Sequence, residues 1–473
     1  MKPREPMTRI ATAIPVNGPY PPYRGGAAAR TGFPRPPSAR GNDAAMAGRI
    51  ADRMIVLVML LAVTATFTIS SAMLTNWKIH YLTAGGAFYE KFHPATGLTF
   101  LAFGLLLLRH GDPIGEIDRM LSRSKLILLY LACWLFLLVQ MFVLNRPFTV
   151  IIDTFLLPVV LCLVIWRLSP MQRKPLVWAA HLTILLNVCI GYYEYFSGHR
   201  LIPLTLGDVL VVGEWRSSAL LGHPLTASGL VGGYILALVL RPALCPGIML
   251  RTALIAFCLG SLMAFGGRTA LVTVLLVMGS VAAWEVWLIA RGKRVSLPTV
   301  IATLCLLFIA AAGIFAALDL GIFDKMLLRF SSDKGSALAR FATFNLLSHF
   351  DWHELVLGPD PTRVNALQAQ LGLNYGIENF WISCIVQFGL IHTILLTVGL
   401  IGLFVEILRR AHPAAWAIVL LILVIAASSV SFSSKNIQLA QFIILITLLL
   451  PRDPASATPR SLVAAGKPIR IQR

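Results

Sequence analysis

Two arginines of this 473-residue chain stand beside long apolar runs, where a positive charge is costly unless an anion meets it. Arg216 lies in the segment EWRSS (214–218), and Arg268 follows two glycines in the segment FGGRTAL (265–271). A guanidinium binds phosphate oxygens through paired hydrogen bonds. The two residues therefore predict a site for the phosphate or diphosphate of a lipid-linked substrate.

The surroundings of Arg268 strengthen this interpretation. Two glycines let the backbone turn tightly, so that a new helix can begin at once. An anion held there would also meet the exposed N–H groups and the positive end of that helix. Arg340 is a third candidate for the diphosphate, although its spacing fits a solvated polar face equally well. His223 is a secondary candidate, because its position before Pro224 marks the start of a helix.

Three residues in the second half of the chain are candidates for a general base. His349 and His353 titrate near neutral pH and can take a proton from a sugar hydroxyl. Glu378 directly precedes a long apolar run, so its carboxylate is expected near the membrane surface. Asn379, the first residue of that run, is a secondary candidate for the site. The residues leave open which of the three side chains acts.

The composition predicts a polytopic, all-α membrane protein, because 57% of the residues are hydrophobic and only 13% are charged. Apolar runs suggest about twelve transmembrane helices. Their expected ranges are 54–74, 95–108, 125–144, 149–166, 176–196, 219–240, 251–265, 269–289, 299–318, 379–405, 414–431 and 437–450.

Lysine and arginine concentrate on the side of this bundle that holds both termini, which predicts that both termini are cytoplasmic. The domain plan has three parts: a disordered cytoplasmic tail (1–50), the helical bundle (51–450) and a second cytoplasmic tail (451–473). The net charge of +19 is scattered over termini and short loops. It therefore indicates contacts with membrane lipid and no nucleic-acid partner.

A loop over residues 319–378 is expected on the outer side and is too long to be a mere connection. Within it, residues 336–350 place Leu338, Phe341, Phe344 and Leu347 at three-residue spacing. This pattern predicts an amphipathic helix on the outer leaflet or over the bundle. A second short helix is expected from Thr362, as its cap, to Leu371.

The chain contains no Walker loop, dinucleotide fingerprint, HExxH segment or paired CxxC motif, so neither a cofactor nor a metal is predicted. Asp153 is a carboxylate within the fourth expected helix. It can be the structural partner of an arginine, or an ion site that would favour a transporter.

Four segments together resemble the O-antigen ligase and polysaccharide polymerase family of bacterial inner-membrane glycosyltransferases. They are Arg216 followed by GHP (222–224), GRTAL (267–271), Arg340 with LG (357–358) downstream, and NFWI (379–382) leading into QFGLI (387–391). The resemblance covers roughly residues 200–405.

The resemblance implies a GT-C-like enzyme that uses no metal or nucleotide sugar. Its donor would be an undecaprenyl-diphosphate-linked oligosaccharide, bound at the periplasmic face of the inner membrane. Arg216 and Arg268 would hold the diphosphate, and Arg340 would position the substrate. A chain-length regulator and export proteins would be partners. Many members have a histidine where this chain has Glu378, which favours a polymerase of exopolysaccharide or O-antigen repeat units.

Two alternatives stay open. The acceptor can instead be lipid A core or a protein side chain, which would make the chain an O-antigen ligase or a protein O-oligosaccharyltransferase. A transporter or flippase of lipid-linked sugar is the alternative outside the enzymes, and it needs a continuous polar path through the bundle.

Overall fold

The computed structural model describes residues 39–452, apart from positions 84, 110, 207–208, 211–214, 246, 374–375 and 433 and most positions between 296 and 335. Both expected tails fall largely outside this part, as do most of the helix expected over 299–318 and the start of the expected outer loop. The chain divides into two compact units, 1–47 and 48–473, and the second holds all the elements below except the beginning of the first helix.

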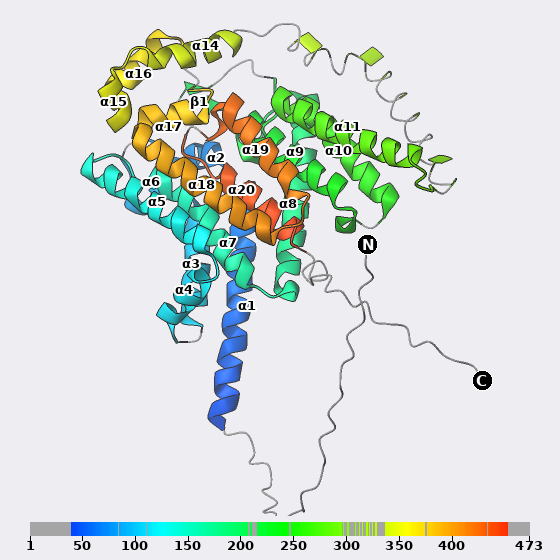
Figure 1. The fold of residues 1–473 in the computed structure, drawn as a ribbon, viewed down its shortest axis with the longest axis horizontal. Helices are drawn as coiled ribbons and strands as arrows, with labels where there is room; N and C mark the ends of the chain where they lie inside the picture. Colours follow the sequence, from blue (N-terminus) through cyan, green and yellow to red (C-terminus); the bar gives the residue numbers. More distant parts are fainter. Residues whose placement is uncertain are drawn as a thin grey trace, which may run out of the picture. The chain divides into compact units, whose positions relative to one another are not determined.

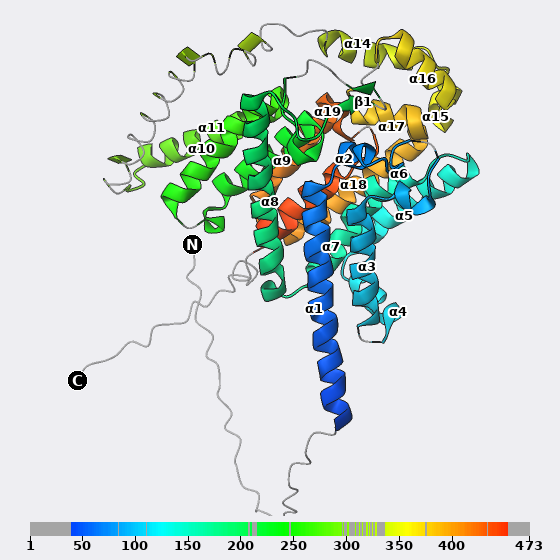
Figure 2. The ribbon, with the colours of Figure 1, turned by 180° about the vertical axis from the view of Figure 1, so that it is seen from behind.

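The described residues are almost entirely helical (Figures 1 and 2). The first group of helices comprises α1 (Ala39–Thr68), α2 (Ser71–Asn76), η1 (Phe88–Lys91), α3 (Pro94–Leu108), α4 (Pro113–Leu121), α5 (Lys125–Val143), α6 (Thr149–Ile151), η2 (Ile152–Leu156), α7 (Leu157–Arg167) and α8 (Pro170–Ser197). The second group comprises η3 (Ala219–Leu221), α9 (Pro224–Leu240), η4 (Pro242–Leu244), α10 (Ile248–Phe265) and α11 (Arg268–Ala290). The third group comprises α14 (Ser336–Leu347), α15 (Trp352–Leu357), α16 (Pro361–Gln370), α17 (Phe380–Phe388), α18 (Leu390–Arg410), α19 (Ala415–Ser428), η5 (Val430–Phe432), α20 (Gln438–Ile444) and η6 (Leu445–Leu449).

Extended structure in the described part is limited to two short antiparallel pairings. Strand β1 (Thr205–Leu206) pairs with β2 (Val209–Leu210), and Ala411 forms an isolated bridge with Pro451.

Seven described helices are long and apolar enough to cross a membrane. They are Gly48–Thr68, Lys125–Val143, Thr149–Arg167, Pro170–Ser197, Ile248–Phe265, Arg268–Ala290 and Leu390–Arg410. Shorter apolar helices occupy Pro94–Leu108, Pro224–Leu240, Ala415–Ser428 and Gln438–Leu449. Helices α7, α9 and α20 are buried along nearly their whole length and form the interior of the bundle. These features confirm an all-helical chain with the character of a membrane protein.

Several of the expected helices differ from the structure. The one expected over 219–240 is interrupted at Gly222 and His223, between η3 and α9. The first was expected over 54–74, but α1 ends at Thr68 and the hydroxyl of Ser70 caps a separate helix, α2. The tenth was expected as one helix over 379–405, but the chain breaks at Gly389 between α17 and α18.

The helices of the expected outer loop pack on α17. Figures 1 and 2 both place α14, α15 and α16 (yellow) together beside α17. A separate apolar cluster that includes Leu346, Val364 and Val386 joins these elements. A helix in this segment is confirmed, but of its predicted apolar stripe only Leu347 packs against this cluster. Leu338, Phe341 and Phe344 are exposed, whereas Thr343 and Leu346 on another face are buried. The expected cap of the second short helix is wrong, because Asp360 caps α16 in place of Thr362.

The break at Gly389 is a point of close backbone contact between the end of α17 and the end of α15. Gly389 adopts φ +84° and ψ 161°, a region that is essentially restricted to glycine. A Cβ atom there would lie 2.6–2.7 Å from backbone atoms of residues 356–358. Gln140 of α5 donates hydrogen bonds to the carbonyl oxygens of Phe388 (2.7 Å) and Leu357 (3.2 Å), so both segments are held by one side chain.

Replacing Gly389 by alanine is therefore expected to destabilise the protein by at least about 3 kcal/mol, because backbone strain and overpacking add. The melting temperature of the purified protein in detergent measures this effect. Gly104→Ala is the matched control, since a Cβ at Gly104 meets no atom within 4 Å. Equal melting temperatures for the two variants would contradict the close contact.

A buried polar cluster ties three segments together at one end of the bundle. Asp153, in the π-helical segment η2, lies 3.7 Å from the ammonium group of Lys435. Its carboxylate also accepts hydrogen bonds from the hydroxyl of Thr96 (2.6 Å) and the N–H of His93 (3.2 Å). Of the two alternatives for Asp153, the structure favours a structural ion pair, and its charged partner is a lysine where an arginine had been considered. Lys435 further donates to the carbonyl oxygen of Tyr81 (3.1 Å).

His93 makes this region sensitive to acid. Its Nδ1 accepts a hydrogen bond from the N–H of Ala95 and its Nε2 lies 3.0 Å from the carbonyl oxygen of Ile69, an arrangement that needs the neutral ring. Burial, together with the nearby charge of Lys435, lowers the pKa of His93 to about 4. The unfolded chain, with the ordinary value near 6.5, binds the proton more readily.

Stability is therefore expected to fall as the pH drops below about 6.5, and this loss should level off near pH 4 at roughly 3 kcal/mol. His93→Asn keeps an oxygen that can cap α3 but cannot titrate. The difference in melting temperature between the wild type and this variant, measured from pH 7 to pH 4, isolates the effect. Parallel pH curves for the two proteins would contradict it.

Candidate functional site

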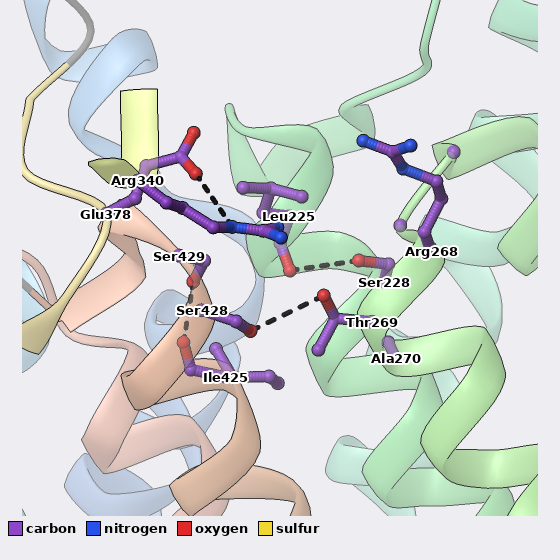
Figure 3. A pocket seen from close by; sticks show the side chains of 12 residues that line it. Leu225, Ser228, Arg268, Thr269, Ala270, Arg340, Glu378, Ile425, Ser428 and Ser429 are labelled. Carbon is purple, nitrogen blue, oxygen red and sulfur yellow. Dashed lines mark hydrogen bonds and ion pairs between the residues drawn. The ribbon is translucent and has the colours of Figure 1, made fainter. Parts of the chain in front are cut away.

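A small cavity of about 60 Å³ brings together three of the candidate residues, Arg268, Arg340 and Glu378. They come from three distant segments, since Arg268 begins α11, Arg340 lies on α14 and Glu378 precedes α17. Figure 3 shows Arg340 and Glu378 on one side of the cavity and Arg268 on the other. Two guanidinium groups and one carboxylate give the cavity a net positive charge, which suits an anion.

The N-terminus of α11 forms one wall of this cavity. The helix begins at Arg268 with Gly267 as its N-cap, and residues 266–270 all line the cavity. The first N–H groups of a helix have no partner within it, and the helix dipole places partial positive charge there. Arg268 and this helix end therefore line the same cavity.

The turn before α11 requires both glycines. Gly266 adopts φ +62° as the left-handed cap of α10. A Cβ at Gly267 would lie 2.0 Å from the hydroxyl oxygen of Ser228 on α9. The remaining lining is rich in hydroxyl groups, because Ser428 and Ser429 at the end of α19 line the cavity together with Thr269. The hydroxyl of Ser428 lies 3.4 Å from that of Thr269.

Glu378 and Arg340 form an ion pair, with 3.5 Å between Oε2 and Nε. The Glu378 side chain is 23% exposed and that of Arg340 is 47% exposed, so both can be reached from solvent. Arg340 therefore places its positive charge beside both the Glu378 carboxylate and the cavity that the two residues line.

Arg216 lies next to the cavity without lining it in the described part of the chain. A Cβ at Gly266 would lie 2.7–2.8 Å from Cγ and Cδ of Arg216, so the stem of this arginine covers the turn before α11. The carbonyl oxygen of Arg216 accepts a hydrogen bond from Arg200. The structure thus brings Arg216 to the same turn as Arg268, but it does not place both guanidinium groups in one cavity.

Glu194 on α8 fixes the segment that carries Arg216. This role was not predicted from the sequence. Its buried carboxylate accepts hydrogen bonds from the N–H groups of Ser218 and Ala219 (2.9 Å each) and of Leu201 (3.1 Å). The sequence feature that could have indicated this role is a carboxylate at the end of an apolar span, because a buried carboxylate needs hydrogen-bond donors or a cation.

Two secondary candidates are helix caps. His223 is the N-cap of α9, and its Nδ1 accepts a hydrogen bond from the N–H of Leu225, as its position before Pro224 predicts. Asn379 is the N-cap of α17 and accepts from the N–H of Ile382. Asn379 also donates to the carbonyl oxygen of Ala427 (3.4 Å), which joins the Glu378 segment to α19. Both residues therefore position the walls of the cavity.

The two candidate histidines lie elsewhere. Neither His349 nor His353 is among the described residues that line the cavity. His349 Nδ1 lies 2.9 Å from the carbonyl oxygen of Asn345, and Arg363 donates to the carbonyl oxygen of His349. His353 is exposed on α15. Of the three candidate bases, the structure brings Glu378 alone to the two arginines of the cavity.

Across the described residues, no three His, Cys, Asp or Glu side chains gather closely enough to hold a metal ion. The expectation of a reaction without metal or cofactor stays a prediction. Comparisons of the chain with family models, with curated proteins and with solved structures find no match in any of the three.

Proposed function

We propose that this chain is a metal-independent glycosyltransferase that polymerises exopolysaccharide or O-antigen repeat units. The donor is an undecaprenyl-diphosphate-linked oligosaccharide at the periplasmic face of a bacterial inner membrane. About twelve spans in a GT-C-like arrangement, with both termini cytoplasmic, would present the cavity on that face. The observation that carries the proposal is the meeting of Arg268, Arg340 and Glu378 at the N-terminus of α11.

The diphosphate of the donor would bind at this helix end. Charge-assisted hydrogen bonds from Arg268 and Arg340 are stronger than neutral ones, and the first N–H groups of α11 add donors that need no rearrangement. Negative charge builds up on the diphosphate as it leaves. Groups that stabilise this charge in the transition state accelerate the reaction itself and not only binding.

Glu378 would act as the general base. Its carboxylate takes the proton of the acceptor hydroxyl, whose oxygen forms the new bond to the anomeric carbon of the donor sugar. The bond from that carbon to the diphosphate oxygen breaks, and the electron pair leaves with undecaprenyl diphosphate. The reaction is a direct displacement, so no covalent enzyme intermediate is required. The ion pair with Arg340 would hold Glu378 close to the departing group.

The same cavity would serve an O-antigen ligase or a protein O-oligosaccharyltransferase, which differ only in the acceptor. Glu378 in place of the family's histidine favours the polymerase. The transporter alternative relied on Asp153 as an ion site within the membrane. The pairing of Asp153 with Lys435 weighs against it, because the carboxylate already has a charged partner.

The test is transfer by the purified chain in nanodiscs, with lipid-linked oligosaccharide isolated from its host cells. A polymerase releases undecaprenyl diphosphate and yields lipid-linked glycans of two and more repeats. A ligase gives a single transfer, and only after lipid A core is added. Movement of labelled lipid-linked sugar across proteoliposomes without glycosidic bond formation would contradict the proposal and support a flippase.

A further inference from the structure

A second cavity lies beside the first and is much larger. It has a volume of about 510 Å³ and is bounded by α16, α17 and the segment that follows α5. Sites for small molecules usually have volumes of about 300–1,000 Å³. The first cavity, at about 60 Å³, is far below this range and suits a compact anionic group, so a sugar must be held elsewhere.

The two cavities share a wall. Glu378 lines the first and the preceding residues Gly376 and Ile377 line the second, while Ser429 lines the first and Val430 the second. These two segments touch, because a Cβ at Gly376 would lie 2.6 Å from Cγ1 of Val430. The base of the proposed reaction therefore stands at the boundary between the cavities.

The lining of the second cavity combines neutral polar groups with apolar surface. Asn365 and Gln368 extend from α16, and their side-chain amides make no hydrogen bond to any described residue. Opposite them, the amide of Gln387 donates to the hydroxyl of Ser383 (2.7 Å). Val364 and Phe388 supply apolar contact.

The single guanidinium in this lining is already engaged. Arg146 donates to the carbonyl oxygens of Gln387 and of Pro359, the latter at 3.0 Å. These bonds hold the start of α16 against the end of α17 and leave the amides as the groups offered to a ligand. Amides both donate and accept, which matches the hydroxyl groups of a neutral sugar. The apolar residues match its C–H faces.

From this arrangement we infer that the second cavity binds neutral sugar residues of the acceptor glycan. This inference rests on the proposed function, since it assigns the acceptor to a site next to the base. The acceptor enters between α16 and α17, and Asn365 and Gln368 bind its hydroxyl groups. Its terminal sugar lies at the wall that carries Glu378, with the donor diphosphate on the other side.

The test compares Gln368→Leu with Gln370→Leu. Both glutamines lie on α16, but Gln370 is exposed and is not among the residues lining the cavity. The probe is the oligosaccharide of two repeats released by mild acid from the lipid-linked glycans of the host. Its binding to the full chain in nanodiscs is measured by saturation-transfer NMR. Loss of one neutral hydrogen bond should raise the Kd about five-fold in Gln368→Leu. Gln370→Leu should match the wild type.

In the transfer assay, Gln368→Leu should raise the KM for the acceptor by a similar factor and leave kcat unchanged. Equal affinity of both variants for the probe, or no binding of the probe to the wild type, would overturn the assignment of the cavity. Binding that depends on Gln368 in a protein without transferase activity would refute the proposed function and keep the sugar site. Transfer with an unchanged KM for the acceptor in Gln368→Leu would refute the sugar site and keep the proposed function.

Discussion

Replacing Arg268 by glutamine is expected to lower kcat for glycan transfer by about 100- to 1,000-fold. The substitution keeps a polar side chain with hydrogen-bond donors, but it shortens the side chain and removes the charge that meets the diphosphate. Because Arg268 stands at the first position of α11, the loss falls where the helix end also acts. Release of undecaprenyl diphosphate by the purified variant gives the rate.

Arg291→Gln is the matched control, since Arg291 follows the opposite end of the same helix and stacks over Trp287 at 3.9 Å. This control should retain the wild-type rate, and both variants should melt near the wild-type temperature. If the Arg268→Gln protein is folded and as active as the control, the cavity does not have the proposed role.

Glu378→Gln is expected to lower kcat by about 100- to 10,000-fold while donor binding persists, because an amide cannot accept the proton of the acceptor hydroxyl. The measurement is the rate of transfer together with the affinity for the donor, for both proteins.

The choice among the three candidate bases depends on two further variants. A double variant, His349→Asn with His353→Asn, should keep most of the activity, because neither histidine is among the described residues lining the cavity. Glu354→Gln controls for loss of a carboxylate on neighbouring α15, where Glu354 pairs with Arg363 at 2.5 Å. If the histidine variant loses glycan-transfer activity and Glu378→Gln retains it, the general base is a histidine.

Most described helices could be predicted from the sequence, because long apolar runs need little context. The helices over 125–143 and 268–290, for example, lie within a residue or so of their expected ends. Failures occur where tertiary contacts decide. The break at Gly389 depends on the backbone of residues 356–358, which is distant in sequence. Pairing of Asp153 with Lys435 likewise leaves no local signal.

The candidate site was predictable residue by residue but not as an assembly. Arg268 could be identified from its glycines and Arg216 from its apolar neighbours, since both features are local. Nothing local indicates that Glu378 pairs with Arg340, or that the stem of Arg216 covers Gly266 while its guanidinium stays outside the cavity lining. Glu194 could not be distinguished from other acidic residues until its three backbone partners were known.

Equilibrium binding of undecaprenyl diphosphate to the purified protein in nanodiscs tests the central claim most directly. The account predicts saturable binding that inorganic pyrophosphate competes away. It also predicts that the Kd rises at least about ten-fold in Arg268→Gln and stays unchanged in Arg291→Gln, since one charged hydrogen-bonding group is worth roughly 1.5–3 kcal/mol. Equal affinity in these two variants, or no displacement by pyrophosphate, would show that the diphosphate does not bind at the N-terminus of α11.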